Sequence, residues 1–176
     1  MKIIDCVQGT PEWIKARCGV PSASSFDKII TTKGEPSKQR TKYLWQLAGE
    51  TVTGIPEENY SNSIMERGKI VEAEARQLYE LISGQEVAQV GFCLAEGYGA
   101  SPDGLVATEG LLELKCPSIA TQVGYLLDNT LPTDYFQQVQ GQLLVTGRKW
   151  VDFVSYYPGL KPLIIRVKRD EGFLKA

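Results

Sequence analysis

The sequence predicts an α/β (α+β) domain in which helices flank a central mixed β-sheet. Two changes of hydrophobic spacing predict it. Up to Gly84 the apolar residues mostly follow helical spacing, and after it they follow the period of strands. Helical spacing returns at 118–146, before two closing strands. The expected order is αααα-βββ-αα-ββ. We expect all 176 residues to form one domain, since 43% hydrophobic composition can fill a single core.

The helices before Gly84 are predicted by their ends. Thr10 and Pro11 begin the first helix, because Thr is a favoured N-cap and Pro a favoured first helical residue. Ser37 is expected to cap the third helix. The longest helix carries an apolar stripe that includes Val71, Ala75 and Leu78. After the one that begins at Thr10, the expected helices cover 22–30, 37–52 and 63–83, separated by loops at 31–36 and 54–62.

The strands after Gly84 are expected at 86–95, 99–107, 111–116, 150–157 and 162–169, with helices at 118–128 and 133–146. The strand 111–116 should be interior. Leu112, Leu114 and Cys116 give it one wholly apolar face, and Leu111 begins the other face.

Composition excludes several kinds of chemistry. The chain has no histidine, which excludes histidine-based triads, general bases and metal ligands. Its four cysteines have no metal-ligand spacing, so we expect reduced thiols. No apolar run approaches the roughly 18 residues of a membrane span, and the N-terminus lacks a secretory pattern, so we expect a cytoplasmic protein. Carboxylates and lysine remain as the reactive groups.

One hairpin is predicted to bring such groups together. If 99–106 and 111–116 pair, Asp103 in its Pro-Asp-Gly turn converges with Glu113, and Lys115 shares the face of Glu113. Converging carboxylates repel unless a cation lies between them, and Mg²⁺ binds such oxygens together with a phosphate. A solvated hairpin is the alternative. We favour the metal site, because a Glu and a Lys in an interior strand are costly unless paired or metal-bound.

Two further positions each have two possible interpretations. Ser24 stands near the start of the helix at 22–30, where free amides favour phosphate, with Arg17 close by; simple capping is the alternative. Glu72 borders the apolar stripe of the longest helix, and could instead be a rim carboxylate paired with Arg76 one turn later. The net charge of −2 is unusual for a nucleic-acid-binding protein, although basic residues cluster at 33–42, 148–149 and 166–169.

Four motifs give a specific resemblance. Ser101-Pro102-Asp103-Gly104 with Glu113-Leu114-Lys115-Cys116-Pro117 resembles the active-site signature of the phage lambda exonuclease and YqaJ-type viral recombinase nucleases, a branch of the PD-(D/E)xK superfamily. The other three blocks are similar to that family's motifs and occur in its order. They are Trp13-Ile14-Lys15-Ala16-Arg17 with Gly19-Val20-Pro21-Ser22-Ala23-Ser24, then Arg67-Gly68-Lys69-Ile70-Val71-Glu72-Ala73-Glu74-Ala75-Arg76, and Tyr135-Phe136-Gln137-Gln138-Val139-Gln140.

The resemblance implies a restriction-endonuclease-like PD-(D/E)xK core and a Mg²⁺- or Mn²⁺-dependent DNA exonuclease with two ions per site. Asp103, Glu113, Glu72 and the backbone carbonyl of Leu114 are the expected metal ligands. Lys115 would orient water or stabilise charge on the phosphate. The expected contacts to the DNA end or the adjacent phosphate are Arg17, Ser24, Ser101 and Gln138.

The resemblance also implies a biological setting. Two alternative functions stay open. The resemblance implies digestion of linear duplex DNA from its ends, 5′→3′, for phage-type recombination in a bacterial host, a ring-shaped trimer and a single-strand annealing partner. The chain stops soon after its last strand, so it looks shortened relative to that family. Another PD-(D/E)xK nuclease, of structure-specific, restriction or iron–sulfur type, is the nearer rival, and the cysteine group of the iron–sulfur type is absent. A catalytically silent DNA-binding module is the other.

Overall fold

The computed structural model describes residues 1–57 and 62–175, with side chains described at 1–57 and 70–175. Within these residues, five strands form a mixed sheet in the order β2-β5-β6-β7-β8. β6 and β7 pair in parallel and the other neighbours are antiparallel. The strands are β2 (Val87–Ala88), β5 (Gly104–Val106), β6 (Gly110–Lys115), β7 (Trp150–Ser155) and β8 (Leu163–Lys168). β6 therefore lies in the middle of the sheet, as its sequence predicts.

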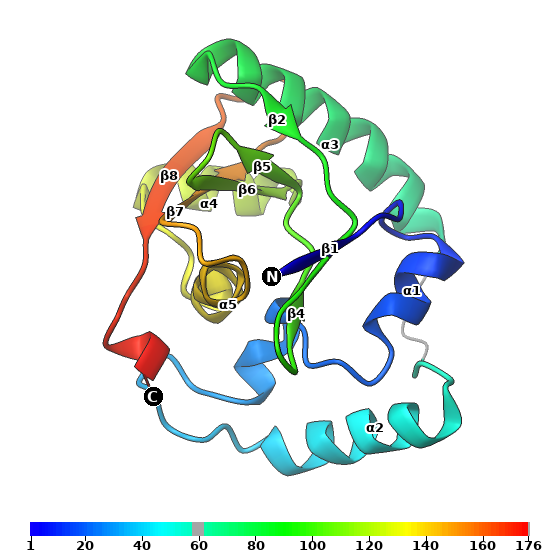
Figure 1. Cartoon of the computed structure of the whole chain (residues 1–176). Helices are drawn as coiled ribbons and strands as arrows, with labels where there is room; N and C mark the ends of the chain where they lie inside the picture. The colour runs from blue at the N-terminus through cyan, green and yellow to red at the C-terminus, as the bar shows by residue number, and fades with distance from the viewer. Residues whose placement is uncertain (58–61, 176) are drawn as a thin grey trace.

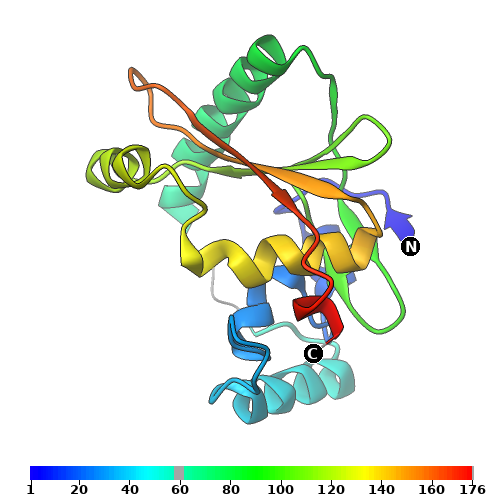
Figure 2. The same ribbon diagram turned by 90° about the vertical axis from the view of Figure 1, so that its left-hand side faces the viewer.

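Helices cover both faces of this sheet (Figures 1 and 2). On one face, α3 (Asn62–Ser83) packs Ala75 and Tyr79 against the even-numbered leucines of β6, Leu112 and Leu114. On the other face, α5 (Phe136–Thr146) packs its own apolar side chains against Leu111. The alternation of strand side chains thus places Leu111, Glu113 and Lys115 on the α5 side. α4 (Ile119–Asp128) connects β6 to α5 and begins at its N-cap Ser118.

A second, three-stranded sheet and the N-terminal helices form the other part of the molecule (Figure 1). The sheet consists of β1 (Lys2–Ile4), β3 (Phe92–Leu94) and β4 (Gly99–Ala100). Beside it lie α1 (Pro11–Arg17), the 3₁₀ segment η1 (Ala23–Lys28) and α2 (Arg40–Thr53). η1 packs closely on α5, because a Cβ at Gly141 would lie 2.6 Å from the Phe26 ring.

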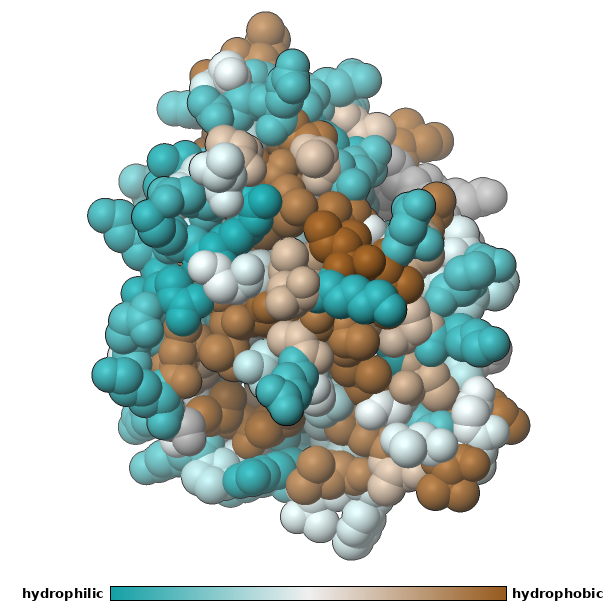
Figure 3. Space-filling view, in the orientation of Figure 1, coloured by the Kyte–Doolittle hydropathy of each residue, from teal (hydrophilic) through white to brown (hydrophobic). Residues whose placement is uncertain are grey.

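α2 is buried on one side only. Tyr43, Leu47 and Glu50 point inward, whereas Leu44 and Trp45 are exposed. Figure 3 shows apolar residues along the lower edge of the molecule, where α2 lies in Figure 1. No helix among the described residues is both long and apolar enough to cross a membrane.

The helix starts were predicted with mixed success. Thr10 caps α1 as expected, since its Oγ1 accepts the Trp13 amide at 3.4 Å. Ser37 is not the cap of α2, because its carbonyl accepts the Arg40 amide in a preceding turn and Gln39 occupies the cap position. The predicted helix at 22–30 is a 3₁₀ segment kinked at Ser25.

Some strand predictions need correction. The expected strand 86–95 divides into β2 and β3, and the expected strand 99–107 divides into β4 and β5. In both cases the two halves belong to different sheets. β1 and the short 3₁₀ turn η3 (Phe173–Lys175) were not predicted, and the helix expected at 133–146 begins with the 3₁₀ turn η2 (Thr133–Tyr135). An extended chain that passes from one sheet to the next keeps its side-chain alternation, so the sequence pattern does not mark the crossing.

Candidate active site

The predicted hairpin is present, and it places Asp103, which precedes β5, beside β6. Gly104 pairs with Leu112, and the Asp103 amide donates to the Leu112 carbonyl at 3.1 Å. Beyond this point the Asp103 side chain continues the pairing, because its Oδ2 accepts the Leu114 amide at 2.6 Å. The N–H and C=O of one strand residue point to the same side. The Leu114 carbonyl therefore points toward the Asp103 side of β6, as a metal ligand there requires.

Glu113 is buried on the α5 side of β6, with 3% of its side chain exposed. Its Oε1 accepts Lys115 Nζ at 2.5 Å and Gln138 Nε2 at 2.6 Å. Its Oε2 accepts Gln142 Nε2 at 2.5 Å. Gln138 and Gln142 are one turn apart on α5, so the helix presents two amide donors to the two carboxylate oxygens. Hydrogen bonds to both of its oxygens therefore fix the Glu113 carboxylate in position.

Gln142 was not predicted as a site residue. Its side chain is buried, and its Oε1 has no hydrogen-bond partner among the described residues. The sequence does carry a usable signal, because Gln142 follows Gln138 by four residues and must share its helix face.

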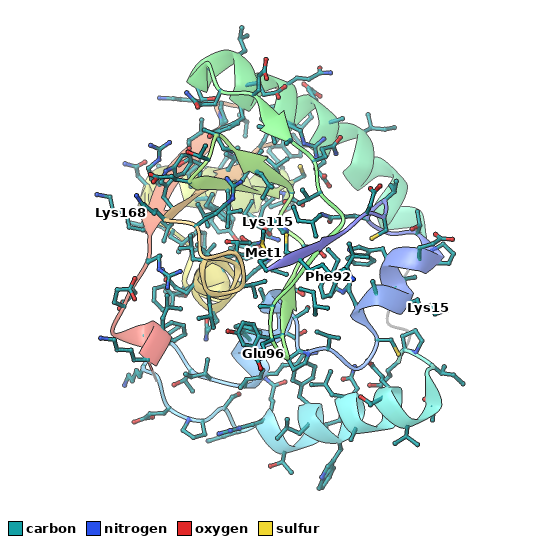
Figure 4. All side chains as sticks on the ribbon, viewed as in Figure 1. Met1, Lys15, Phe92, Glu96, Lys115 and Lys168 are labelled. Carbon is teal, nitrogen blue, oxygen red and sulfur yellow. The ribbon has the colours of Figure 1, made fainter. Side chains whose placement is uncertain are left out.

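Lys115 is a cation in this site. Figure 4 shows it in the layer between the sheet and α5. Its ammonium also lies 5.0 Å from the centroid of the Tyr135 ring. Burial lowers the pKa of Lys115, but the neighbouring Glu113 and Asp103 more than offset this and raise the pKa above its ordinary value. Lys115 can therefore donate hydrogen bonds and stabilise anionic oxygen, and it is a poor base.

The electrostatics of Asp103 fit a bound cation. Burial raises the pKa of Asp103 well above its ordinary range, and the charges of Glu113 and Glu72 raise it further, while Lys115 acts in the opposite direction. A divalent ion would offset both the burial and the repulsion. As placed, however, no three Asp, Glu or Cys side chains of the described residues form a ready ligand group. Glu113 and Glu72 are turned toward other partners.

Glu72 has a partner on its own helix and an electrostatic effect on Asp103. Its Oε1 pairs with Arg76 at 2.8 Å, and 38% of its side chain is exposed, as expected for a rim carboxylate. Its charge also acts on Asp103. Arg67, Gly68 and Lys69, which begin the same motif, lie outside the described side chains.

Arg17 and Ser24 line a polar cavity between α1, η1 and α2. Arg17 Nη2 donates to Ser22 Oγ at 3.0 Å and to Ser24 Oγ at 3.2 Å. The cavity has a volume of about 250 Å³, and its wall also contains Lys28 and Glu50. A guanidinium surrounded by hydroxyl groups suits a phosphate.

Trp13 connects this cavity to the carboxylates. The Arg17 guanidinium lies 4.1 Å from the centroid of the Trp13 ring. On its other edge, Trp13 Nε1 donates to Ser101 Oγ at 2.8 Å, two residues before Asp103. The predicted site residues thus form two groups. Asp103, Glu113, Lys115 and Gln138 meet at β6, Arg17 and Ser24 meet at the cavity, and Ser101 lies between the groups through Trp13.

Comparisons with known proteins show the family and the fold of the chain. The model of the YqaJ-like viral recombinase domain matches residues 12–149. The structure resembles that of an alkaline exonuclease, LHK-Exo, from Laribacter hongkongensis, with a TM-score of 0.82 and 35% sequence identity over 94% of this chain and 86% of that one. The complex of LHK-Exo with dAMP gives the same values.

A more distant structure shares the fold. The phage related exonuclease from Haemophilus somnus 129PT has a TM-score of 0.70 at 13% identity, over 89% of this chain and 87% of that one. No curated protein sequence gives a significant match. The matched segment contains the hairpin, the cavity residues and α5, and confirms the resemblance drawn from the four motifs. The chain belongs to the YqaJ-like viral recombinase domain family.

Proposed function

We propose that this protein is a Mg²⁺- or Mn²⁺-dependent exonuclease that digests linear duplex DNA from its ends, 5′→3′, and leaves single strands for phage-type recombination. Family membership and the likeness to an alkaline exonuclease support a nuclease. The observation that carries the proposal is the group of Asp103, Glu113 and Lys115 on the β5–β6 hairpin. In it a half-buried acid with a raised pKa lies beside a second, fixed carboxylate and a protonated lysine.

The residues that would hold the metal are Asp103, Glu113, Glu72 and the carbonyl of Leu114. Two ions per site are expected from the family resemblance alone. The raised pKa of Asp103 and the direction of the Leu114 carbonyl support this ligand set. A bound divalent ion polarises a phosphate and lowers the pKa of its water.

The protein's own groups have separable roles. Lys115 stabilises the charge that develops on the phosphate oxygens, because its ammonium stays protonated in this surrounding. Gln138 and Gln142 hold Glu113 in one orientation. Arg17 and Ser24 bind a terminal phosphate, and Trp13 and Ser101 fix the spacing between that phosphate and the hairpin. Phosphate contacts do not read bases, so sequence specificity is not expected.

The test is hydrolysis of linear duplex DNA by the wild-type protein and by the Asp103→Asn and Lys115→Ala variants. Each variant should lose at least about 10²–10³-fold in rate, the usual effect of removing one group that stabilises the transition state. Lys149→Ala, which breaks a surface ion pair with Glu109, is the control and should retain activity. EDTA should abolish wild-type hydrolysis.

Three outcomes would contradict parts of the proposal. Near-normal turnover by Asp103→Asn would remove the site assignment. Cleavage of covalently closed circular duplex would favour a structure-specific or restriction-type endonuclease. A wild-type protein that binds DNA but hydrolyses none with either Mg²⁺ or Mn²⁺ would be the silent binding module.

The setting of the enzyme remains a prediction from the resemblance. We propose action in the bacterial cytoplasm, assembly as a ring-shaped trimer and a single-strand annealing protein as partner. Light scattering on the purified protein tests the trimer directly, because a monomer of 19.5 kDa would have one third of the expected mass.

A further inference from the structure

We propose that Lys28 is a second cation of the phosphate cavity, and that it makes the cavity selective for a terminal phosphate monoester over a phosphodiester. This inference rests on the proposed function, because it takes the cavity between α1, η1 and α2 as the place where the DNA end binds. Lys28 belongs to none of the motif positions that carry the family resemblance.

Lys28 is held at the cavity by an aromatic ring. It is the last residue of η1, and its ammonium lies 5.1 Å from the centroid of the Tyr43 ring. The Tyr43 hydroxyl accepts the Ser22 amide at 3.4 Å, and Ser22 Oγ in turn accepts from Arg17. All four side chains line the same cavity. Such a contact holds a cation in place without neutralising its charge.

The wall of the cavity also carries negative charge. Glu50 lies in the wall, and its carboxylate accepts the Gly19 amide at 2.8 Å, the Gln46 side chain at 2.9 Å and the Glu57 amide at 3.1 Å. Burial raises the pKa of Glu50, but these three hydrogen bonds and the charge of Arg17 lower it below its ordinary value. Glu50 therefore stays ionised.

An ionised Glu50 offsets part of the attraction that Arg17 exerts on an anion. The Glu57 carboxylate, also at the wall, acts in the same direction. Lys28, by contrast, has no ion pair with any described residue of the chain. The charge of Lys28 is therefore available to the ligand.

The ligand that uses two cations is a phosphate monoester. A terminal monoester carries about −1.5 to −2 charges at pH 7, whereas a diester carries a single negative charge. Arg17, together with the serine hydroxyl groups, can bind one negative charge of the phosphate. Lys28 can bind the second. Lys28 should therefore distinguish phosphorylated 5′ ends from blocked ones.

The experiment measures binding without hydrolysis. Fluorescence anisotropy in EDTA compares three duplexes that differ only at the 5′ end: a phosphate, a methyl phosphodiester and a hydroxyl. For Lys28→Met we expect affinity for the phosphate end to fall about tenfold, the effect of losing one charge-assisted contact. The preference for the methyl phosphodiester over the hydroxyl should remain, because Arg17 is intact. Lys28→Arg should keep most of the wild-type preference.

Lys33→Met is the matched control, since Lys33 is an exposed lysine that does not line the cavity. The proposal is overturned if Lys28→Met weakens all three ends equally, as Lys33→Met should, or weakens none. A melting temperature equal to that of the wild type shows that the variant is folded, and Lys28→Arg decides the question if it is not. Hydrolysis of hydroxyl-ended duplex by the wild-type protein and by Lys33→Met reports on the proposed function separately, because Lys33 does not line the cavity.

Discussion

Replacing Glu72 by Gln tests whether this carboxylate is a metal ligand or a rim carboxylate paired with Arg76. Its ion pair with Arg76 is an i,i+4 pair and partly exposed, so the pair is worth about 0.3–0.5 kcal/mol. Its repulsion of Asp103 acts in the opposite direction. The substitution removes both effects together. In the absence of metal we therefore expect the free energy of unfolding to change by less than about 0.5 kcal/mol.

The ligand hypothesis and the rim-carboxylate hypothesis predict different melting temperatures once metal is present. Metal at about 100 times its Kd stabilises the native state by about 2.7 kcal/mol. In a domain of this size 1 kcal/mol corresponds to about 2–4 °C, so the wild-type melting temperature should rise by about 5–11 °C. If Glu72 is a ligand and its loss weakens binding tenfold, the stabilisation at the same metal concentration falls to about 1.4 kcal/mol. The shift then falls to about 3–6 °C.

The assay is thermal unfolding of wild type and variant over a series of Mn²⁺ concentrations. Glu109→Gln is the control, because Glu109 is also an exposed carboxylate in a surface ion pair but lies away from the site. Its metal-induced shift should equal that of the wild type. If Glu72→Gln shows the same shift as Glu109→Gln at every concentration, Glu72 is a rim carboxylate and no ligand.

Three further variants test the rest of the structure. Gln142→Met should destabilise the protein by about 1–3 kcal/mol, because it leaves the buried Oε2 of Glu113 without its donor. Its single-turnover hydrolysis per folded molecule should fall at least about tenfold, and unchanged turnover would contradict the orienting role. Arg17→Ala should reduce cleavage of 5′-phosphorylated ends far more than of 5′-hydroxyl ends; equal losses would mean that Arg17 is structural. Tyr79→Phe removes the hydroxyl bonded to buried Asp152 at 2.7 Å, so the protein should lose about 1.5 kcal/mol and melt about 3–6 °C lower, while activity per folded molecule stays the same.

The sequence predicted the centre of the site because the relevant geometry is local. Glu113 and Lys115 must share a face of any strand, since side chains alternate. The apolar residues around them predicted an interior strand, and the Pro-Asp-Gly turn placed Asp103 at the start of the paired strand. Short-range rules of this kind also predicted the cap of α1 and the end of α3 at Gly84.

Other features depend on which elements meet. The face of α5 that carries Gln142 is visible in the sequence, but its contact with Glu113 exists only because α5 crosses β6 there. In the same way, Trp13 joins Ser101 to Arg17 across 88 positions of the chain. No periodicity records such a separation.

Tertiary structure also decided how the strands divide into sheets and what surrounds the polar groups of the cavity. Extended backbone on both sides of residues 101–103 has one pattern, yet β4 and β5 belong to different sheets. From the sequence, Glu50 and Lys28 are predicted only to lie on helices. They share a cavity wall because η1 and α2 pack together. Hydrophobic periodicity determines which side of an element is buried, whereas the partner on that side is chosen by the packing of the whole chain.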